Sequence, residues 1–256
     1  MGSIDLIQLA LDAVKSGGKA AIATVVRTDR SVPRRVGATM LIHADGTREG
    51  TVGGGEMESR VIAEAIDAMS DGKPRFINYR LVDPASGDPG VCGGEMDVYV
   101  EPYMDTATLL VIGAGHVGKA VSELAAWSGW KVYLWDDRPE QLADVPQGVN
   151  GHGGELSSAL TNIPLDARSA IVMVTRNVNL DVELVPLLIS QQAAYIGLMG
   201  SVRRWKTTRD LLIQAGCSEA DIQRISTPIG LEIGAETPEE IAISIIAEVV
   251  HATTTR

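Results

Sequence analysis

The feature that most constrains the fold is a strand, a glycine turn, a helix and a second strand that follow one another in the second half of the chain. The apolar residues 109–112 lead into GAGHVG at 113–118, and a helical stretch continues to Ala126. The second strand, residues 131–135, ends in Asp136. An acidic residue about 20 positions after such a turn is typical of dinucleotide-binding βαβ units. The pattern predicts a Rossmann-like fold with a nucleotide at the turn.

Strands and helices continue to alternate towards the C-terminus, as a parallel sheet covered by helices requires. Strands are expected at 171–174 and 194–198, and helices at 182–191 and 202–215. The last helix opens with Thr237, Pro238 and Glu240, which match a capping box. We therefore place a Rossmann-like nucleotide-binding domain at residues 106–256.

The first part of the chain has a different pattern, in which two helices are set among short strands. Helices are expected at 4–14 and 56–69, and strands at 20–26, 40–43, 76–81 and 96–100. The Asp45-Gly46 pair indicates a hairpin turn, and a domain boundary is expected at 102–106. The sequence thus predicts an α/β protein with a mixed α/β N-terminal domain, residues 1–105, followed by the Rossmann-like parallel-sheet domain.

An arginine cluster lies in the predicted N-terminal domain. Arg27, Arg30, Arg34 and Arg35 fall within nine residues of a chain whose formal net charge is −11. Such a concentration of positive charge in an acidic protein indicates a local device for holding an anion. The overall charge argues against nonspecific binding to nucleic acid or to an anionic membrane surface.

A triple glycine, Gly53, Gly54 and Gly55, opens the predicted helix that follows. Glycines let backbone N–H groups approach a ligand, and a helix start favours negative charge. The alternative is a tight turn in which Glu56 and Glu58 only complement the helix dipole. The nearby arginines favour the anion site.

The two cysteines, Cys92 and Cys217, are far apart and form no CxxC pair, which argues against a disulfide framework or a zinc site. Cys92 follows a loop rich in Asp, Pro and Gly, so we interpret it as an exposed thiol at a site. Cys217 follows a predicted helix end and is interpreted as a packed, inert thiol. No signal peptide or membrane-spanning run is evident, so we expect a cytoplasmic protein.

Four blocks of the sequence resemble the XdhC/CoxI family, the molybdenum-cofactor chaperones of xanthine dehydrogenase and related molybdenum hydroxylases. They occur in the family's order and span nearly the whole chain: VRTDRSVPRRVGATMLIHADGTREGTVGGGEMESR, VCGGEMDVYVEP, GAGHVGKAV, and YIGLMGSVRRW with TPIGLEIGAETPEEIAISIIAEVV. The resemblance implies binding of a molybdopterin-type cofactor, delivery to a molybdenum hydroxylase apo-enzyme, and a homodimer.

Two positions depart from the family pattern. Glu56 stands where the family usually carries the cysteine of GGGC, the thiol thought to contact the molybdenum centre, and Val178 stands where a histidine is often found. A glutamate is a hard oxygen ligand or an acid/base group, whereas a thiolate is a soft ligand. Glu56 and Cys92 are therefore the candidates for approaching the metal.

Several residues of the predicted nucleotide-binding turn allow two interpretations. Gly113, Gly115 and Gly118 suit a diphosphate-binding turn, and His116 within the turn either contacts the ligand or makes an ordinary loop hydrogen bond. Asp136 either binds a ribose hydroxyl, which favours NAD, or caps the next turn. Arg138 would suit a phosphate instead. Arg203 and Arg204 are secondary candidates for the cleft.

Two functions of different class follow. In the first, Arg27, Arg34 and Arg35 with the triple glycine hold a molybdopterin-type cofactor for delivery to a molybdenum hydroxylase. The Rossmann-like domain then holds a nucleotide or docks a partner. In the alternative, an NAD(P)-dependent oxidoreductase, Glu56 is the acid/base for a small-molecule substrate. The fold alone does not decide between them.

Overall fold

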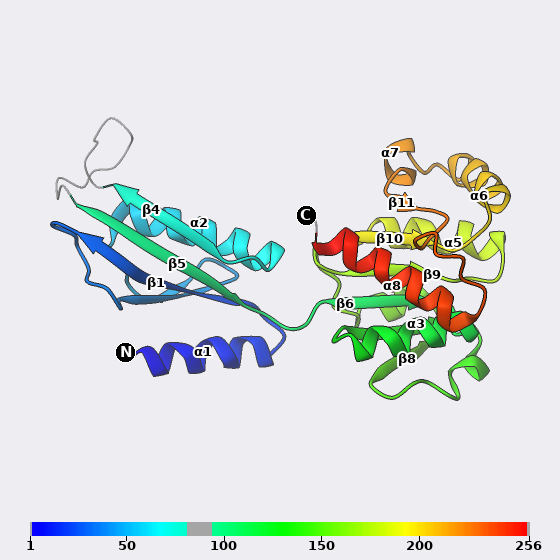
Figure 1. Cartoon of the computed structure of the whole chain (residues 1–256), viewed down its shortest axis with the longest axis horizontal. Coiled ribbons are helices and arrows are strands. Elements are labelled where there is room, and N and C mark those ends of the chain that lie inside the picture. Colours follow the sequence, from blue (N-terminus) through cyan, green and yellow to red (C-terminus); the bar gives the residue numbers. More distant parts are fainter. Residues whose placement is uncertain (1, 81–93, 255–256) are drawn as a thin grey trace. The chain divides into compact units, whose positions relative to one another are not determined.

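The computed structural model describes residues 2–80 and 94–254. The chain divides into two compact units, Met1–Asp105 and Thr106–Arg256 (Figure 1). Each unit has its own sheet, so each is described by itself. In the described parts of the chain no helix is both long and apolar enough to cross a membrane.

The N-terminal unit is built on a five-stranded antiparallel sheet with the order β3-β2-β1-β5-β4. Its strands are β1 (Ala20–Asp29), β2 (Thr39–His43), β3 (Arg48–Gly50), β4 (Arg75–Arg80) and β5 (Glu95–Tyr103). The helices are α1 (Ser3–Lys15) and α2 (Gly55–Asp71). A hydrogen bond of 2.9 Å from His43 N to Thr47 O closes the β2–β3 hairpin at the expected turn.

The two helices cover opposite faces of this sheet, because the side chains of β1 alternate between them. Ala20 and Ile22 pack with Leu6 of α1, whereas Ala21 and Ala23 belong to the cluster that includes α2. Both sets are buried. Around β1 the sheet is therefore apolar on both faces, whereas Phe76 and Asn78 of β4 are exposed.

The C-terminal unit is a six-stranded parallel sheet with the order β11-β10-β9-β6-β7-β8. Its strands are β6 (Thr108–Ile112), β7 (Lys131–Asp136), β8 (Val149–Gly153), β9 (Ala170–Met173), β10 (Tyr195–Leu198) and β11 (Ile225–Ser226). Counted within the unit, this is the doubly wound order 3-2-1-4-5-6. Strand order reverses between β6 and β9, and ligands of such sheets bind beyond the carboxyl ends of the strands at that point.

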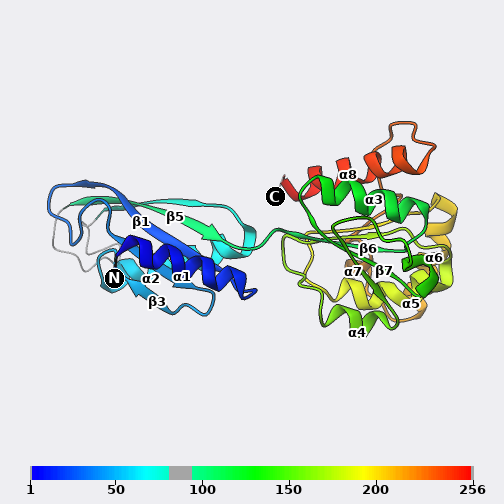
Figure 2. The ribbon, with the colours of Figure 1, turned by 90° about the horizontal axis from the view of Figure 1, so that it is seen from below.

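Helices lie on both faces of the parallel sheet (Figure 2). Two pack against one face, α3 (His116–Trp127) and α8 (Pro238–Thr254). The other face is covered by α4 (Leu156–Leu160), α5 (Val178–Ile189) and α6 (Val202–Gln214). The short elements η2 (Pro139–Leu142) and α7 (Glu219–Ile222) complete the unit. Strands β6, β7, β9 and β10 between these layers are almost fully buried, which explains their continuous apolar runs, whereas the edge strand β8 is largely exposed.

The predicted fold class is confirmed, whereas several elements were not expected. Strands β3, β8 and β11 and helices α4 and α7 are short and lack a clear period. Helix α5 begins at Val178, four residues before the predicted start, because the Asn177 side chain accepts a hydrogen bond from Leu180 N. The capping box at Thr237 and Glu240 is present, with both reciprocal hydrogen bonds formed.

Candidate functional site

The arginine cluster lies at the end of β1, which carries Arg27, and on the loop that joins β1 to β2, which carries Arg30, Arg34 and Arg35. A register shift between Val25 and Arg27 marks a bulge where the cluster begins. The Arg27 side chain is 62% exposed and lies 3.4 Å from Asp97. Arg34 and Arg35 are exposed, and neither forms an ion pair with any described residue. Arg30 is likewise exposed and forms no ion pair with a described residue, so this loop, residues 30–38, presents three uncompensated guanidinium groups to solvent.

The triple glycine lies next to this loop. A Cβ atom on Gly53 would come within 3.0 Å of Pro33 Cγ, so the two segments are packed together. Gly54 and Gly55 are exposed, have φ angles of 94° and 66°, and would each place a Cβ atom in open space. These left-handed conformations favour glycine and leave the backbone at the start of α2 accessible.

Gly94, from the sequence block VCGGEMDVYVEP, also approaches the arginine loop. A Cβ atom on Gly94 would lie 2.2 Å from the carbonyl oxygen of Ser31, so only glycine allows this approach. Cys92 lies outside the described residues. Three motifs far apart in the sequence therefore meet around residues 30–38.

Glu56 is the first side chain after the triple glycine, and it is 41% exposed. Its Oε1 atom accepts a hydrogen bond of 2.8 Å from Arg60 Nη2, one turn further along α2. Within residues 2–80 and 94–254, no three His, Cys, Asp or Glu side chains converge as a metal-binding group. The Arg60 pair engages only Oε1 and leaves the second carboxylate oxygen of Glu56 without a hydrogen-bond partner among the described residues.

Glu58 is a residue of this region that the sequence interpretation did not select; the sequence assigns it only a role as a complement to the helix dipole. It is buried, although it lies only two positions after Glu56. Its carboxylate accepts hydrogen bonds from Thr51 Oγ1 and, at 3.4 Å, from Gly53 N, and it pairs with Arg48 Nη2 at 3.1 Å. Glu58 thereby ties the triple glycine to β3.

The electrostatic balance at Glu58 keeps its carboxylate ionised. Burial alone would raise its pKa, but the Thr51 hydrogen bond, the Arg48 charge and the N–H groups of Gly53 and Gly54 outweigh burial and lower the pKa below 4.5. The charged carboxylate can therefore hold the glycine segment at neutral pH.

A second candidate site lies at the carboxyl edge of the parallel sheet. Gly113 has a φ angle of 110°, and a Cβ atom on Gly118 would lie 1.7 Å from Gly113 O, so the helix start packs directly on the turn. A Cβ atom on Gly115 would meet nothing within 4 Å. His116 is exposed at the first position of α3. The turn has the geometry that close approach to a diphosphate requires.

Asp136 closes this turn from the end of β7 and is only 1% exposed. Its Oδ2 atom accepts a hydrogen bond of 2.7 Å from Ala114 N. Arg138 donates to both carboxylate oxygens, from Nε at 2.9 Å and from Nη2 at 3.1 Å, and its backbone N–H adds a third bond. A ribose hydroxyl could therefore reach Asp136 only after Arg138 had moved.

A cavity of about 80 Å³ opens at the same edge, between the ends of β6, β7 and β9. Its lining comprises Gly113, Gly115, Trp135, Asp136, Asp137, Arg138, Val174, Thr175, Arg176 and Leu180. Arg176 Nη1 and Nη2 each donate a 2.6 Å hydrogen bond to one oxygen of Asp137. These bonds are the main cause of the lowered pKa of the Asp137 carboxyl. The cavity thus combines a glycine turn with two arginines.

Arg204, a secondary candidate from the sequence, is held inside the unit and does not project freely. It binds Asp181 on α5 and the Thr175 side chain and carbonyl after β9. Asp181 is fully buried. Its role was not predicted, because only the fold brings it beside a residue 23 positions away. The three residues fix one wall of the cavity.

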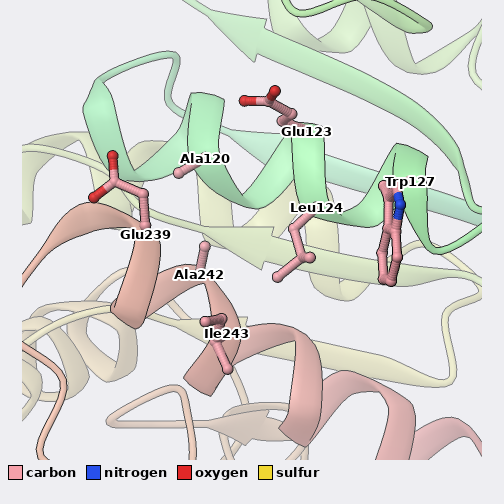
Figure 3. Close-up of a pocket in the computed structure, with 7 residues that line it drawn as sticks. All are labelled: Ala120, Glu123, Leu124, Trp127, Glu239, Ala242 and Ile243. Atoms are coloured by element: carbon pink, nitrogen blue, oxygen red, sulfur yellow. The ribbon is translucent and has the colours of Figure 1, made fainter.

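An apolar groove of about 310 Å³ runs between α3 and α8 (Figure 3). Leu124 of α3 and Ile243 of α8 line it, and Trp127, 84% exposed, stands at one end. Its charged residues are Glu123 and Glu239. Two carboxylates repel phosphate groups, so this groove differs in chemistry from both candidate anion sites.

Cys217 behaves as the sequence indicated. It is partly buried against the core, and burial raises the pKa of its thiol above 9.0. A thiol of this kind is unreactive at neutral pH.

Comparison with known proteins relates both units to one family. Residues 13–80 match the model described as the XdhC and CoxI family, and residues 109–249 match the XdhC Rossmann domain. The chain is 35% identical to the uncharacterized protein YqeB of Escherichia coli (strain K12) over 90% of its own length, but it spans only 43% of YqeB. It is 22% identical to the molybdenum cofactor insertion chaperone PaoD of the same organism, over 95% of this chain and 86% of PaoD.

One solved structure covers both units. It is described as a xanthine dehydrogenase from Bacillus halodurans, is 21% identical, has a TM-score of 0.52, and is matched over 100% of this chain and 97% of its own. At that identity the likeness shows the fold alone. The two family matches carry the assignment, and the chain belongs to the XdhC and CoxI family.

Proposed function

We propose that this protein binds a molybdopterin-type cofactor and delivers it to the apo-enzyme of a molybdenum hydroxylase of the xanthine dehydrogenase kind. The family membership and the similarity to the chaperone PaoD support this proposal. The observation that carries it is the meeting of the arginine loop with the triple glycine through Pro33 and Gly53. Guanidinium groups are donors that a phosphate requires, and a helix start such as that of α2 favours negative charge.

The proposed binding mode assigns a role to each part of this site. Arg34 and Arg35, with Arg27 at the base of the loop, attract the anionic part of the cofactor, and the exposed glycines at the start of α2 receive it. Glu56 and Cys92 are the groups that approach the metal. For Glu56, the approach would use the carboxylate oxygen that Arg60 does not contact.

The proposal extends to location and assembly. We expect the protein to be a cytoplasmic homodimer. Its contact with the apo-hydroxylase would be transient, because the cofactor must be released after delivery. The Rossmann-like unit would bind a nucleotide at the turn formed by Gly113, Gly115 and Gly118, with His116 at its rim.

The test is to load the purified protein with cofactor released from a xanthine dehydrogenase and to measure protein-bound molybdenum and pterin after gel filtration. The wild type should retain both in equal amounts. Arg34→Ala/Arg35→Ala should weaken retention by about tenfold or more, because two charge-assisted contacts are lost. Arg203→Ala/Lys206→Ala is the matched control, since it removes two exposed cations from α6. Equal retention by all three proteins would refute the proposed site.

A second candidate is an NAD(P)-dependent oxidoreductase, favoured by the glycine turn and cavity at the carboxyl edge of the parallel sheet. In that case Glu56 would be the acid/base and its unit would hold the substrate. Glu56→Gln should then lower turnover by on the order of a hundredfold and leave nucleotide affinity unchanged. Cofactor retention without any hydride transfer to or from a nicotinamide would exclude this candidate.

A further inference from the structure

An ion pair crosses the mouth of the nucleotide crevice. Arg176 follows β9 and Asp137 follows β7, and the sheet order places β6 between these two strands. The pair therefore passes beyond the carboxyl end of β6, where the glycine turn begins. Both hydrogen bonds are 2.6 Å long, and the two side chains are 41% and 33% exposed. A ligand that enters the crevice must contact or displace this pair.

Arg138 changes the chemistry of the neighbouring acidic position. In this fold the acidic residue after the second strand accepts ribose hydroxyls from a dinucleotide that lacks a 2′-phosphate. Here Arg138 already occupies both oxygens of Asp136, while its Nη1 atom has no hydrogen-bond partner in the part of the chain that the structure describes. The end of β7 therefore presents a guanidinium group instead of a free carboxylate.

We propose that the crevice binds a nucleotide with a phosphate on its adenosine ribose, as in NADP(H), in preference to the form with a free 2′-hydroxyl. Arg138 and Arg176 receive that phosphate, and Asp137 competes with it for Arg176. The proposal rests on the nucleotide-binding role proposed for the Rossmann-like unit. It is independent of cofactor binding by the N-terminal unit.

The charges support this choice. A phosphomonoester carries close to two negative charges at neutral pH, and a guanidinium group binds it through two parallel hydrogen bonds. A ribose diol brings no charge, so it gains little from two arginines. Arg176 loses its bonds to Asp137 when it turns to the ligand, whereas Arg138 can use its unpartnered nitrogen without leaving Asp136.

Because Asp137 competes with the phosphate for Arg176, substitutions of these two residues should change ligand affinity in opposite directions. Removing the Arg176 guanidinium should weaken binding of the phosphorylated ligand. Removing the Asp137 charge should strengthen it, because Arg176 is then free. A crevice whose ion pair only maintained the fold would lose affinity with either change.

The experiment measures binding of 2′,5′-ADP and 5′-AMP by titration calorimetry, since the two ligands differ by the 2′-phosphate. The wild type should bind 2′,5′-ADP about tenfold or more tightly than 5′-AMP. Arg176→Ala should reduce this preference to about threefold or less, and Asp137→Asn should increase it, both without changing 5′-AMP affinity. Arg138→Ala should also reduce the preference, and 5′-AMP should bind no more weakly, because Asp136 is released to accept a ribose hydroxyl. In the same way, the wild type should bind NADPH more tightly than NADH.

Arg209→Ala is the matched control, because Arg209 is 38% exposed and is paired with Glu219 elsewhere in the same unit. It should behave as wild type. Arg138 also supports the turn through Asp136, so thermal unfolding of each variant is recorded. If Arg138→Ala does not fold, the nucleotide preference of Arg176→Ala tests the proposal, because Arg176 is exposed.

Equal affinity for 2′,5′-ADP and 5′-AMP would overturn the proposal, as would weaker binding of 2′,5′-ADP by Asp137→Asn. Failure to bind any of the four nucleotides would also overturn it. If the same protein sample still retained molybdenum and pterin, the proposed cofactor function would stand without nucleotide binding. Loss of cofactor retention alone would leave the nucleotide preference intact.

Discussion

Arg204 on α6 holds the buried carboxylate of Asp181 on α5 through three contacts of 2.7 to 3.1 Å. The same guanidinium group donates to Thr175, which follows β9 at the edge of the nucleotide crevice. Two helices on one face of the sheet are therefore fastened to the end of a central strand. The wall of the crevice depends on an ion pair that is largely shielded from water.

This pair predicts a large stability effect from one substitution. Asp181→Ala leaves Arg204 without its carboxylate and should destabilise the C-terminal unit by about 3–5 kcal/mol. Thermal or urea unfolding measures the loss. Asp210→Ala removes a carboxylate that is 56% exposed and 4.0 Å from Arg209, so it should change stability by less than about 0.5 kcal/mol. Similar effects of the two substitutions would contradict the assigned role of Asp181.

Substitutions of Gly118 and Gly115 in the candidate nucleotide turn should affect stability and nucleotide binding separately. Gly118→Ala forces a Cβ atom against Gly113 O and should cost roughly 1–3 kcal/mol. Gly115→Val meets open space at an extended φ of −72°, so the fold should tolerate it while the side chain blocks the ligand. Unfolding curves and nucleotide titrations on both variants check this. A Gly115→Val protein that binds nucleotides normally would remove the turn from the site.

Glu58 predicts a dependence of stability on pH. Its pKa in the folded protein lies below the ordinary 4.5, so its charged form stabilises the N-terminal unit above that pH. This contribution is lost as the pH falls through the lowered pKa. Glu58→Ala should cost roughly 1–3 kcal/mol at pH 7, because Thr51 and Gly53 lose their acceptor.

Unfolding of wild type and Glu58→Ala from about pH 7 to about pH 3 measures this effect, and the difference between them should shrink at the acid end. Glu56→Ala is the control, since that side chain is 41% exposed and has only the Arg60 pair to lose. A difference that stayed constant with pH would show that Glu58 acts through packing and not through its charge.

Much of the fold follows from local pattern, because a periodic apolar run or a turn residue acts within a few positions. The Thr237 capping box, the βαβ order around Gly113 and the hairpin at Asp45 are of this kind. Glu58 and Asp181 differ, because their partners come from other elements. The helical period places Glu58, but not Glu56, on the face of Val61 and Ala65, yet the partners that keep its buried carboxylate charged come from outside the helix.

The hydrogen-bond partners of Asp136, a candidate site residue, also could not be predicted from the local sequence. The sequence leaves open a ribose ligand at Asp136, a capping role for it, and a phosphate at Arg138; in the structure Arg138 binds both oxygens of Asp136. Arg138 is visible in the sequence, but the direction of its side chain depends on the path of the chain after β7. The presence of a crevice was predictable, whereas its chemistry required the structure.

Glu56 should distinguish metal approach from a purely local role. If Glu56 stands in for the family's soft ligand, Glu56→Cys should retain or tighten binding of the molybdopterin-type cofactor, and Glu56→Ala should weaken it by about threefold or more. Arg60→Ala, which frees Glu56 from its pair, should not weaken binding. Cofactor retention after gel filtration measures all three. Wild-type retention by Glu56→Ala would leave Glu56 as a helix-start residue only.

The most direct test of the central claim is activation of a molybdenum hydroxylase. The apo form of a xanthine dehydrogenase is mixed with free cofactor, or with the same amount of cofactor bound to this protein, and the appearance of hydroxylase activity is followed. The account predicts faster and more complete activation with the loaded protein, and the loss of this advantage for Arg34→Ala/Arg35→Ala but not for Arg203→Ala/Lys206→Ala. Equal activation by free and protein-bound cofactor would contradict it.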